Sequence, residues 1–317
     1  MSAHSFLVKT YGLNQVHESG DVVFHPDISL SDADALLAYC SPVDELLSFR
    51  GPKAWYCIES LAHSRFRGEP LWRKAYAKLQ SDGLFLHYAS PNPAWRVPHY
   101  CTGHDSYSLY YDSQTRKSEE AVAVISFFGG RFWRLSKWMR LRNAFATHAK
   151  TKLYGSKDWN RFNPWGMLGP KSPPSNYVGE PAVRWHSTRD HYAWMSQFKV
   201  IICMENRCEP FYFTEKFPAA VMAGAIPIYH AHEQIANTVL QGALWVDPKD
   251  FGFDPSRTID YALEQDVSAY QKANAAWLFS DRIANATRKA ILDRIAGLFL
   301  KEFPEVTGKC CDVEKQT

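Results

Sequence analysis

The chain alternates between short apolar runs and longer segments in which apolar residues recur every three or four positions. The short runs are rich in β-branched and aromatic residues, and they predict strands at 21–25, 54–58, 84–89, 121–128, 199–204, 225–229 and 243–247. The helical periodicity predicts helices at 31–48, 70–81, 131–149, 215–224, 233–241 and 256–265, and a long helix around 267–302. Strands that alternate with helices indicate parallel sheets covered on both faces. We therefore expect an α/β protein built from Rossmann-like units.

The polar segment DSQTRKSEE at 112–120 interrupts this alternation. Its composition is typical of a linker, and we place the boundary between two domains, 1–118 and 119–317, within it. A chain of 317 residues is long enough for each domain to bury its own core. Because parallel sheets bind ligands at the carboxyl ends of their strands, two such domains facing each other would hold a ligand in the cleft between them.

Composition narrows the possible functions only slightly. Hydrophobic residues make up 46% and charged residues 22%, as in an ordinary soluble protein, and the net charge of +3 favours no nucleic-acid partner. Aromatic residues make up 15%, with 11 Trp, which suits a sugar-binding cleft and equally a large core. Without a long apolar run near residue 1, we expect no signal peptide or membrane anchor and a cytoplasmic location. The 7 cysteines lack zinc-site spacing, so we expect reduced thiols and no structural metal.

The stretch FYFTEKFPAAVMAGAIPIYH at 211–230 predicts a strand end, a cap at Thr214, a helix from Glu215 and a buried strand. Pro218 is tolerated only near the start of such a helix. Lys216 then lies in the first turn, where free N–H groups make the field positive and a cation costs about 0.3 kcal/mol or more. An anion would remove that cost. The pattern therefore predicts an anion site suited to a diphosphate, with an exposed, mildly unfavourable lysine as the alternative.

A second segment, RFWRLSKWMRLRNAF at 131–145, carries basic residues and no acidic ones. Phe132, Leu135 and Met139 fall on one helical face, with Trp138 beside them. Four interpretations fit the pattern: capture of a phosphate-bearing ligand by an arginine, peripheral contact with a membrane, contact with nucleic acid, and an ordinary solvated face over a packed stripe.

The segment CMENRCEPFYFTEKFPAAVMAGAIPIYHAH at 203–232 resembles the signature of the GT10 family, the α-1,3/1,4-fucosyltransferases. That signature runs from phenylalanine-glutamate-asparagine-serine through an aromatic or aliphatic pair to threonine-glutamate-lysine, a helix and a proline-containing strand. RLRNAF at 140–145 resembles the segment that supplies a diphosphate-binding arginine in a bacterial member. The resemblance is specific from about 121 to 266. Met204 and Arg207 depart from it, since phenylalanine and serine are usual there.

The resemblance implies a GT-B fold and an inverting transfer of L-fucose from GDP-fucose to a hydroxyl of an acceptor oligosaccharide. An N-acetylglucosamine-containing acceptor and an α-1,3-type linkage are expected. Residues 1–118 would bind the acceptor and 119–317 the donor, with the last helix packing back on the first domain. No cofactor would be required, and a divalent metal would at most be stimulatory.

The positions that match the family's donor site are Arg142, Asn206, Tyr212, Glu215 and Lys216. By the resemblance, Arg142 and Lys216 would hold the diphosphate and Glu215 the donor hydroxyls. Asn206 and Tyr212 would line the nucleotide site. Two rival functions stay open: transfer of another GDP-linked sugar, and a non-catalytic protein that binds a nucleotide or a membrane surface.

The catalytic base would be Glu59. AWYCIES at 54–60 sits where the family places a strand that ends in a catalytic glutamate. A base within hydrogen-bond reach of the acceptor hydroxyl is what such a transfer needs. The alternative for Glu59 is an ordinary salt bridge with Lys53 or Arg65.

Overall fold

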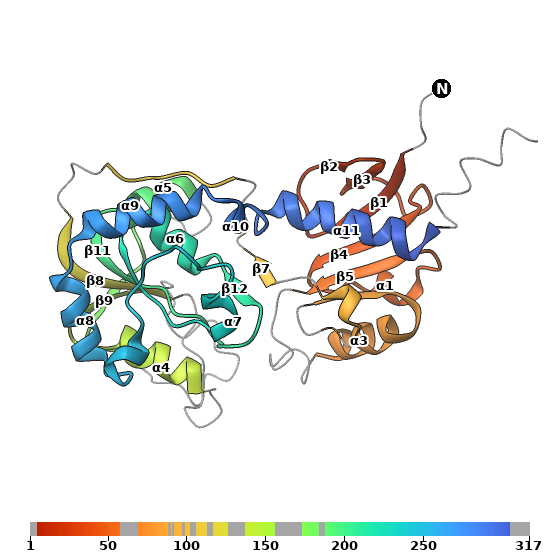
Figure 1. Cartoon of the computed structure of the whole chain (residues 1–317). Helices are drawn as coiled ribbons and strands as arrows, with labels where there is room; N and C mark the ends of the chain where they lie inside the picture. Colours follow the sequence, from red (N-terminus) through yellow and green to blue (C-terminus); the bar gives the residue numbers. More distant parts are fainter. Residues whose placement is uncertain are drawn as a thin grey trace, which may run out of the picture. The chain divides into compact units, whose positions relative to one another are not determined.

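The computed structural model describes residues 5–57, 69–87, 90, 92–96, 99–101, 106–112, 117–125, 137–155, 173–183 and 188–304. The chain forms two compact units. The first combines Met1–Cys101 with Thr287–Thr317, and the second comprises Thr102–Ala286. Figure 1 shows a sheet and flanking helices in each. The first unit ends at Cys101 and resumes at Thr287, and Ser118–Glu120, which were expected to end a linker, begin a strand.

The first unit is built on a six-stranded sheet. Its strands are β1 (Phe6–Tyr11), β2 (His17–Ser19), β3 (Val22–His25), β4 (Ala35–Cys40), β5 (Lys53–Cys57) and β6 (Leu84–Leu86), and β7 (His99–Cys101) follows them along the chain. The order is β2-β3-β1-β4-β5-β6. β1, β3, β4, β5 and β6 pair in parallel, and only β2 runs antiparallel to its neighbour β3. The parallel strands follow the flavodoxin-like order of doubly wound folds.

Helices cover both faces of this sheet. They are α1 (Glu45–Ser48), α3 (Pro70–Asp82), the 3₁₀ helix η1 (Pro93–Trp95) and α11 (Arg288–Glu302). Alternate residues of the central strands enter different cores. Leu37 and Tyr56 pack with Phe299 of α11, whereas Trp55 packs with Trp72 of α3. The strands are therefore buried on both sides, as parallel sheets require.

The second unit is built on a five-stranded, fully parallel sheet. Its strands are β8 (Ser118–Ile125), β9 (Thr151–Gly155), β10 (Tyr177–Gly179), β11 (Phe198–Ile202) and β13 (Ile226–Ile228), in the order β10-β9-β8-β11-β13. Other elements are α4 (Lys137–Ala146), α5 (Thr188–Met195), β12 (Tyr212–Thr214), α6 (Lys216–Met222), α7 (Glu233–Ala236), η3 (Pro248–Phe251), α8 (Pro255–Glu264), α9 (Val267–Leu278) and α10 (Asp281–Ala284). The order of the five strands, β10-β9-β8-β11-β13, is that of a Rossmann sheet. The predicted α/β class with Rossmann-like units is confirmed.

Some predicted elements are wrong. The helix expected at 31–48 is strand β4 followed by the short α1. ALLAYC in β4 is buried at five consecutive positions, and a continuous apolar run gives no period that separates strand from helix. The long helix around 267–302 is three helices, because Ser280 and Thr287 each begin a new one. Residues 243–247 form only one isolated bridge, between Val246 and Ile228.

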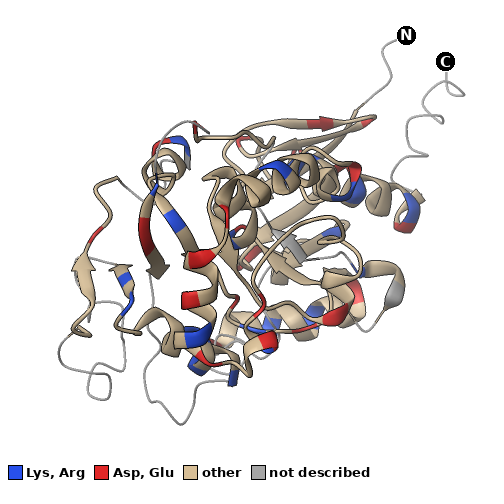
Figure 2. Ribbon diagram, turned by 60° about the vertical axis from the view of Figure 1, so that its left-hand side comes forward, with Lys and Arg blue, Asp and Glu red and all other residues tan. Residues whose placement is uncertain are grey.

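Charges are distributed without large separation between signs. Figure 2 shows Lys and Arg interspersed with Asp and Glu along the ribbon, in agreement with the small net charge. No helix among the described residues is both long enough and apolar enough to span a membrane.

Candidate functional site

A topological switch point lies between β8 and β11. From β8 the chain winds outward through β9 to β10, and it then returns to place β11 on the other side of β8. Connections leave the two strands in opposite directions, and doubly wound sheets bind ligands at this point, beyond the carboxyl ends of the strands. At this edge β11 leads directly into 203–206, and the connection after β8 leads to α4.

Glu205 is the buried centre of the residues at this edge. Its side chain is only 2% exposed. It accepts hydrogen bonds from the Thr214 backbone N–H at 2.8 Å and from the Thr214 hydroxyl at 2.7 Å, and the Tyr229 hydroxyl lies at 3.3 Å. Burial raises the pKa of Glu205, and the nearby Lys216 ammonium opposes that rise. The carboxylate, which follows β11, is thus held in place by Thr214 of β12 and by Tyr229, the residue after β13.

Lys216 is the first residue of α6 and contacts two carboxylates. Its Nζ lies 3.2 Å from Glu205 Oε2 and 3.2 Å from Glu215 Oε1, and it donates to Thr214 Oγ1 at 2.9 Å. Burial alone would lower the pKa of Lys216, but the two carboxylates outweigh it and raise the pKa above its usual range. The chain itself therefore supplies the negative partner that a lysine in a first helical turn needs.

Arg142 lies in the interior and not on a solvated face of α4. It is 7% exposed, and its Nη1 donates to Oδ1 of Asn206, which lies in the loop after β11. Its Nε and Nη2 donate to Asn143 Oδ1 at 3.3 and 3.1 Å. Burial lowers the pKa of Arg142 to about 10, which leaves the guanidinium charged near neutrality. A buried cation is thus held at the same edge as Lys216.

Tyr212 lies close enough to interact electrostatically with both cations. The preceding residue, Phe211, has a φ of 61°, a backbone conformation that residues other than glycine rarely adopt. Its N–H donates to Gln234 Oε1 at 2.9 Å, which holds the turn. Strained backbone of this kind is concentrated at functional sites.

A second group of side chains continues along the same edge. His230, which follows β13, has its Nδ1 2.8 Å from Asp247 Oδ1. The Trp138 indole stacks on the His230 ring, with centroids 5.0 Å apart. Trp138 and Arg142 are four residues apart on α4 and so share a face. Contact with His230 therefore holds the face of α4 that carries Arg142 against the sheet edge.

The five predicted donor-site residues come together in the second unit: Arg142, Asn206, Tyr212, Glu215 and Lys216. Glu59, the predicted base, lies outside the described residues. The expected helix cap at Thr214 is wrong, because its hydroxyl donates to a carboxylate and α6 has no side-chain cap.

Sequence reasoning missed the central role of Glu205 and the group formed by Trp138, His230 and Asp247. Glu205 had a usable signal, since a carboxylate directly after a buried strand lies at the ligand-binding edge. The pairing of His230 with Asp247 had none, because it joins residues 17 apart in the sequence. No group of three His, Cys, Asp or Glu side chains suited to a metal occurs among the described residues.

No protein-family model and no curated protein matches the chain. Among solved structures, an α1,3-fucosyltransferase is 14% identical with a TM-score of 0.42, over 90% of this chain and 82% of that one. An α1,3-fucosyltransferase with GDP-fucose is 14% identical with a TM-score of 0.40, over 87% and 79%. A UDP-forming α,α-trehalose-phosphate synthase from Burkholderia xenovorans, in complex with glucose-6-phosphate, is 11% identical with a TM-score of 0.49, over 83% and 72%. At these values the likeness does not identify an activity.

Proposed function

We propose that the chain is an inverting fucosyltransferase, which moves L-fucose from GDP-fucose to a hydroxyl of an N-acetylglucosamine-containing glycan. One observation carries the proposal: the cations of Arg142 and Lys216 lie together at the switch point of a Rossmann-type sheet. Their neighbours in the sequence resemble the family signature described above, apart from Met204 and Arg207. Two fixed cations at such a point suit a diphosphate, whose oxygens accept hydrogen bonds from guanidinium and ammonium groups.

The carboxylates beside Lys216 define how the donor would bind. Glu205 is fully enclosed and stays with the protein, whereas the Glu215 side chain is 50% exposed. We infer that Glu215 turns to the hydroxyls of the donor sugar, which are hydrogen-bond donors. Its departure leaves one face of Lys216 for the phosphate oxygens. Glu205 then remains the internal counter-ion of Lys216.

The chemistry follows from this placement. The acceptor oxygen bonds to the anomeric carbon from the face opposite the diphosphate, the bond from that carbon to the diphosphate oxygen breaks, and the configuration inverts. Negative charge grows on the leaving GDP, where Arg142 and Lys216 together would contribute about 3 kcal/mol or more to the transition state. The acceptor proton goes to Glu59, and a base in that position typically contributes roughly 10²–10⁴-fold.

Calorimetric titration with GDP tests the donor site. Lys216→Ala should weaken GDP binding about tenfold or more, as expected when a charged hydrogen bond is lost. Lys272→Ala is the matched control, since Lys272 is an exposed lysine on α9. Equal GDP affinity in the two variants would sink the proposed diphosphate site.

Turnover assays test the sugar and the base. Wild-type protein is incubated with a panel of glycans and with GDP-fucose, GDP-mannose or UDP-sugars, and release of the nucleotide is followed. GDP-fucose should be the active donor. Release of nucleotide from GDP-mannose alone would instead support transfer of another GDP-linked sugar. That function is the second candidate because Arg207 stands where the family signature usually has serine. Glu59→Ala should keep GDP binding and lose turnover, and retained turnover would place the base elsewhere.

A further inference from the structure

A cavity of about 380 Å³ lies in the first unit, and none of the residues that line it belongs to the second. It is at the amino edge of the sheet, where Gly51 and Pro52 lead into β5 and Gly83 leads into β6. The proposed base, Glu59, follows the carboxyl end of β5 in the sequence. A five-residue strand spans about 16 Å, so the cavity and the reacting edge lie at opposite ends of β5. A ligand in the cavity would not be the sugar that reacts.

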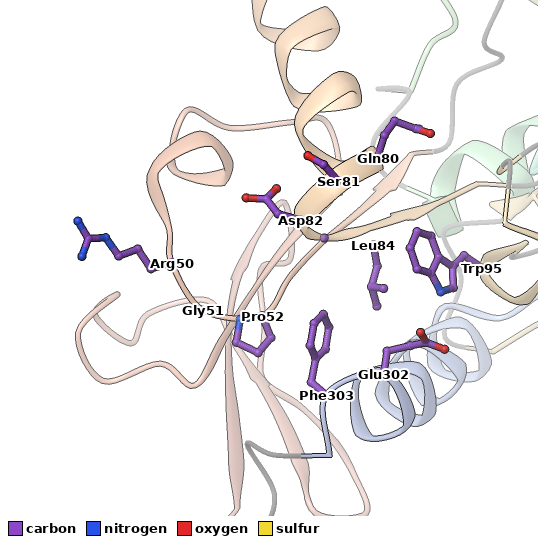
Figure 3. A pocket seen from close by; sticks show the side chains of 11 residues that line it. Arg50, Gly51, Pro52, Gln80, Ser81, Asp82, Leu84, Trp95, Glu302 and Phe303 are labelled. Carbon is purple, nitrogen blue, oxygen red and sulfur yellow. The ribbon is translucent and has the colours of Figure 1, made fainter.

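Two aromatic rings and two carboxylates form the walls of this cavity. Figure 3 shows the Trp95 indole and the Glu302 carboxylate on one side, Asp82 on another, and the Phe303 ring between them. Within the described part of the chain, the buried Trp95 Nε1 has no hydrogen-bond acceptor. Because this nitrogen is also shielded from solvent, Trp95 contributes apolar surface to the cavity and not a hydrogen-bond donor.

The charges in the walls favour a neutral ligand. Asp82 Oδ2 lies 3.2 Å from Lys53 Nζ and 2.7 Å from Lys78 Nζ, so its charge is balanced within the protein. Although burial opposes it, the two lysines lower the pKa of Asp82, which keeps it an acceptor. Glu302 adds a negative charge and Arg50 a positive one. A phosphate would meet two carboxylates, and a purely apolar ligand would cover them without supplying a hydrogen-bond donor.

We propose that this cavity binds one neutral saccharide unit. The Trp95 and Phe303 rings provide apolar surface for the C–H face of a sugar ring, and the carboxylates of Asp82 and Glu302 accept from its hydroxyls. The volume lies within the range of roughly 300–1,000 Å³ typical of small-molecule sites. The identity of this saccharide rests on the proposed function: it would be a distal sugar of an extended acceptor glycan.

The site is already ordered by contacts inside the first unit. Arg294 of α11 donates to the Arg96 carbonyl at 3.0 Å, which fixes the segment that carries Trp95. Arg96 Nε donates to the Ser90 carbonyl at 3.0 Å. Lys53, which is 3% exposed, also donates to the Phe49 carbonyl at 2.6 Å and so anchors the Asp82 side of the cavity. A ligand would therefore bind with little loss of conformational entropy in the protein.

The test measures saccharide binding without any donor nucleotide. Full-length protein labelled with 5-fluorotryptophan is titrated with N-acetyllactosamine, chitobiose and cellobiose, and the Trp95 fluorine signal is assigned by its loss in Trp95→Phe. At least one disaccharide should shift that signal saturably. Glu302→Gln should weaken its binding about tenfold, which corresponds to one charged hydrogen bond. Glu264→Gln is the matched control, because Glu264 and Glu302 are each the last residue of a helix.

Ligand-observed saturation transfer gives a second readout that does not depend on the Trp95 assignment. The proposal is overturned if no disaccharide binds at millimolar concentration, if Glu302→Gln and Glu264→Gln bind equally, or if inorganic phosphate binds in preference. GDP titration of the same samples separates the two proposals. Protein that binds GDP but no saccharide overturns only the cavity site, and protein that binds a saccharide but not GDP overturns only the proposed function.

Discussion

Replacing Glu205 by glutamine probes how the chain balances charge at the switch point. The substitution keeps the size of the side chain and an oxygen that can accept from the Thr214 N–H, but it removes the negative charge 3.2 Å from Lys216 Nζ. At that distance and an effective dielectric constant of about 20, the attraction is about 5 kcal/mol before desolvation is subtracted. Glu205 is 2% exposed and Lys216 27%, so desolvation cancels a large part of it.

We expect Glu205→Gln to lower the free energy of unfolding by about 2 kcal/mol, since Lys216 keeps its second carboxylate, Glu215. The same change leaves Lys216 less compensated, so affinity for GDP should rise about threefold, equivalent to about 0.7 kcal/mol. Urea unfolding gives the stability, and calorimetric titration gives the affinity. Glu264→Gln controls for the loss of an exposed glutamate.

Stability should fall while affinity for GDP rises only if Glu205 is an internal counter-ion of Lys216. Unchanged stability together with weaker GDP binding would refute this reasoning, because it would mean that Glu205 contacts the ligand instead of balancing the lysine. Lower stability together with weaker GDP binding would refute it too, because it would mean that Lys216 needs the full carboxylate to reach the ligand.

Two further predictions concern packing in the second unit. Lys117→Met should cost about 2 kcal/mol relative to Lys272→Met in urea unfolding, because Lys117 Nζ donates to two backbone carbonyls, one of them at 3.0 Å. Burial lowers the pKa of Lys117 to about 8, below its value in the unfolded chain, so between about pH 8 and about pH 10 the unfolded state binds the extra proton. Wild-type stability should therefore rise relative to Lys117→Met across this window, and parallel pH curves would contradict the assignment. Gly224→Ala should destabilise more than Gly252→Ala by about 1–3 kcal/mol in thermal unfolding: both have positive φ, of 66° and 64°, but only at Gly224 would the new Cβ meet a neighbouring aromatic ring, at 2.3 Å. Equal melting temperatures would show that the ring moves aside without cost.

The sequence predicted those parts of the fold whose signal is local. Strand β11 and helix α8 have clear periods and bounded ends, and both are found within a residue or two of their expected limits. Strand β4 was predicted as a helix because it lies inside its sheet, between β1 and β5, and is apolar on both faces. Pairing with β1 and β5 settles its conformation, and the period of its own sequence cannot report that pairing.

The candidate site was predictable to a similar extent. Arg142, Asn206 and Lys216 could be found from charge, strand ends and the family resemblance, and they lie at one edge. What could not be predicted is the local charge balance. The negative partner of Lys216 was expected to be a ligand, but Glu205 is the neighbour at 3.2 Å, brought there by the path from β11 to β12. Such a pairing depends on tertiary structure.

The discontinuity of the first unit sets an order of events during synthesis. Its sheet is made from residues 6–86, but one face is covered by Ile291, Ile295 and Phe299 of α11, near the other end of the chain. That face stays uncovered until roughly 200 more residues have been added, whereas the second unit is continuous and can complete its core earlier. Long-range closure of this kind is slow. A ribosome-bound chain that stops before α11 should therefore carry a folded second unit and an aggregation-prone first one, which chaperones would have to shield.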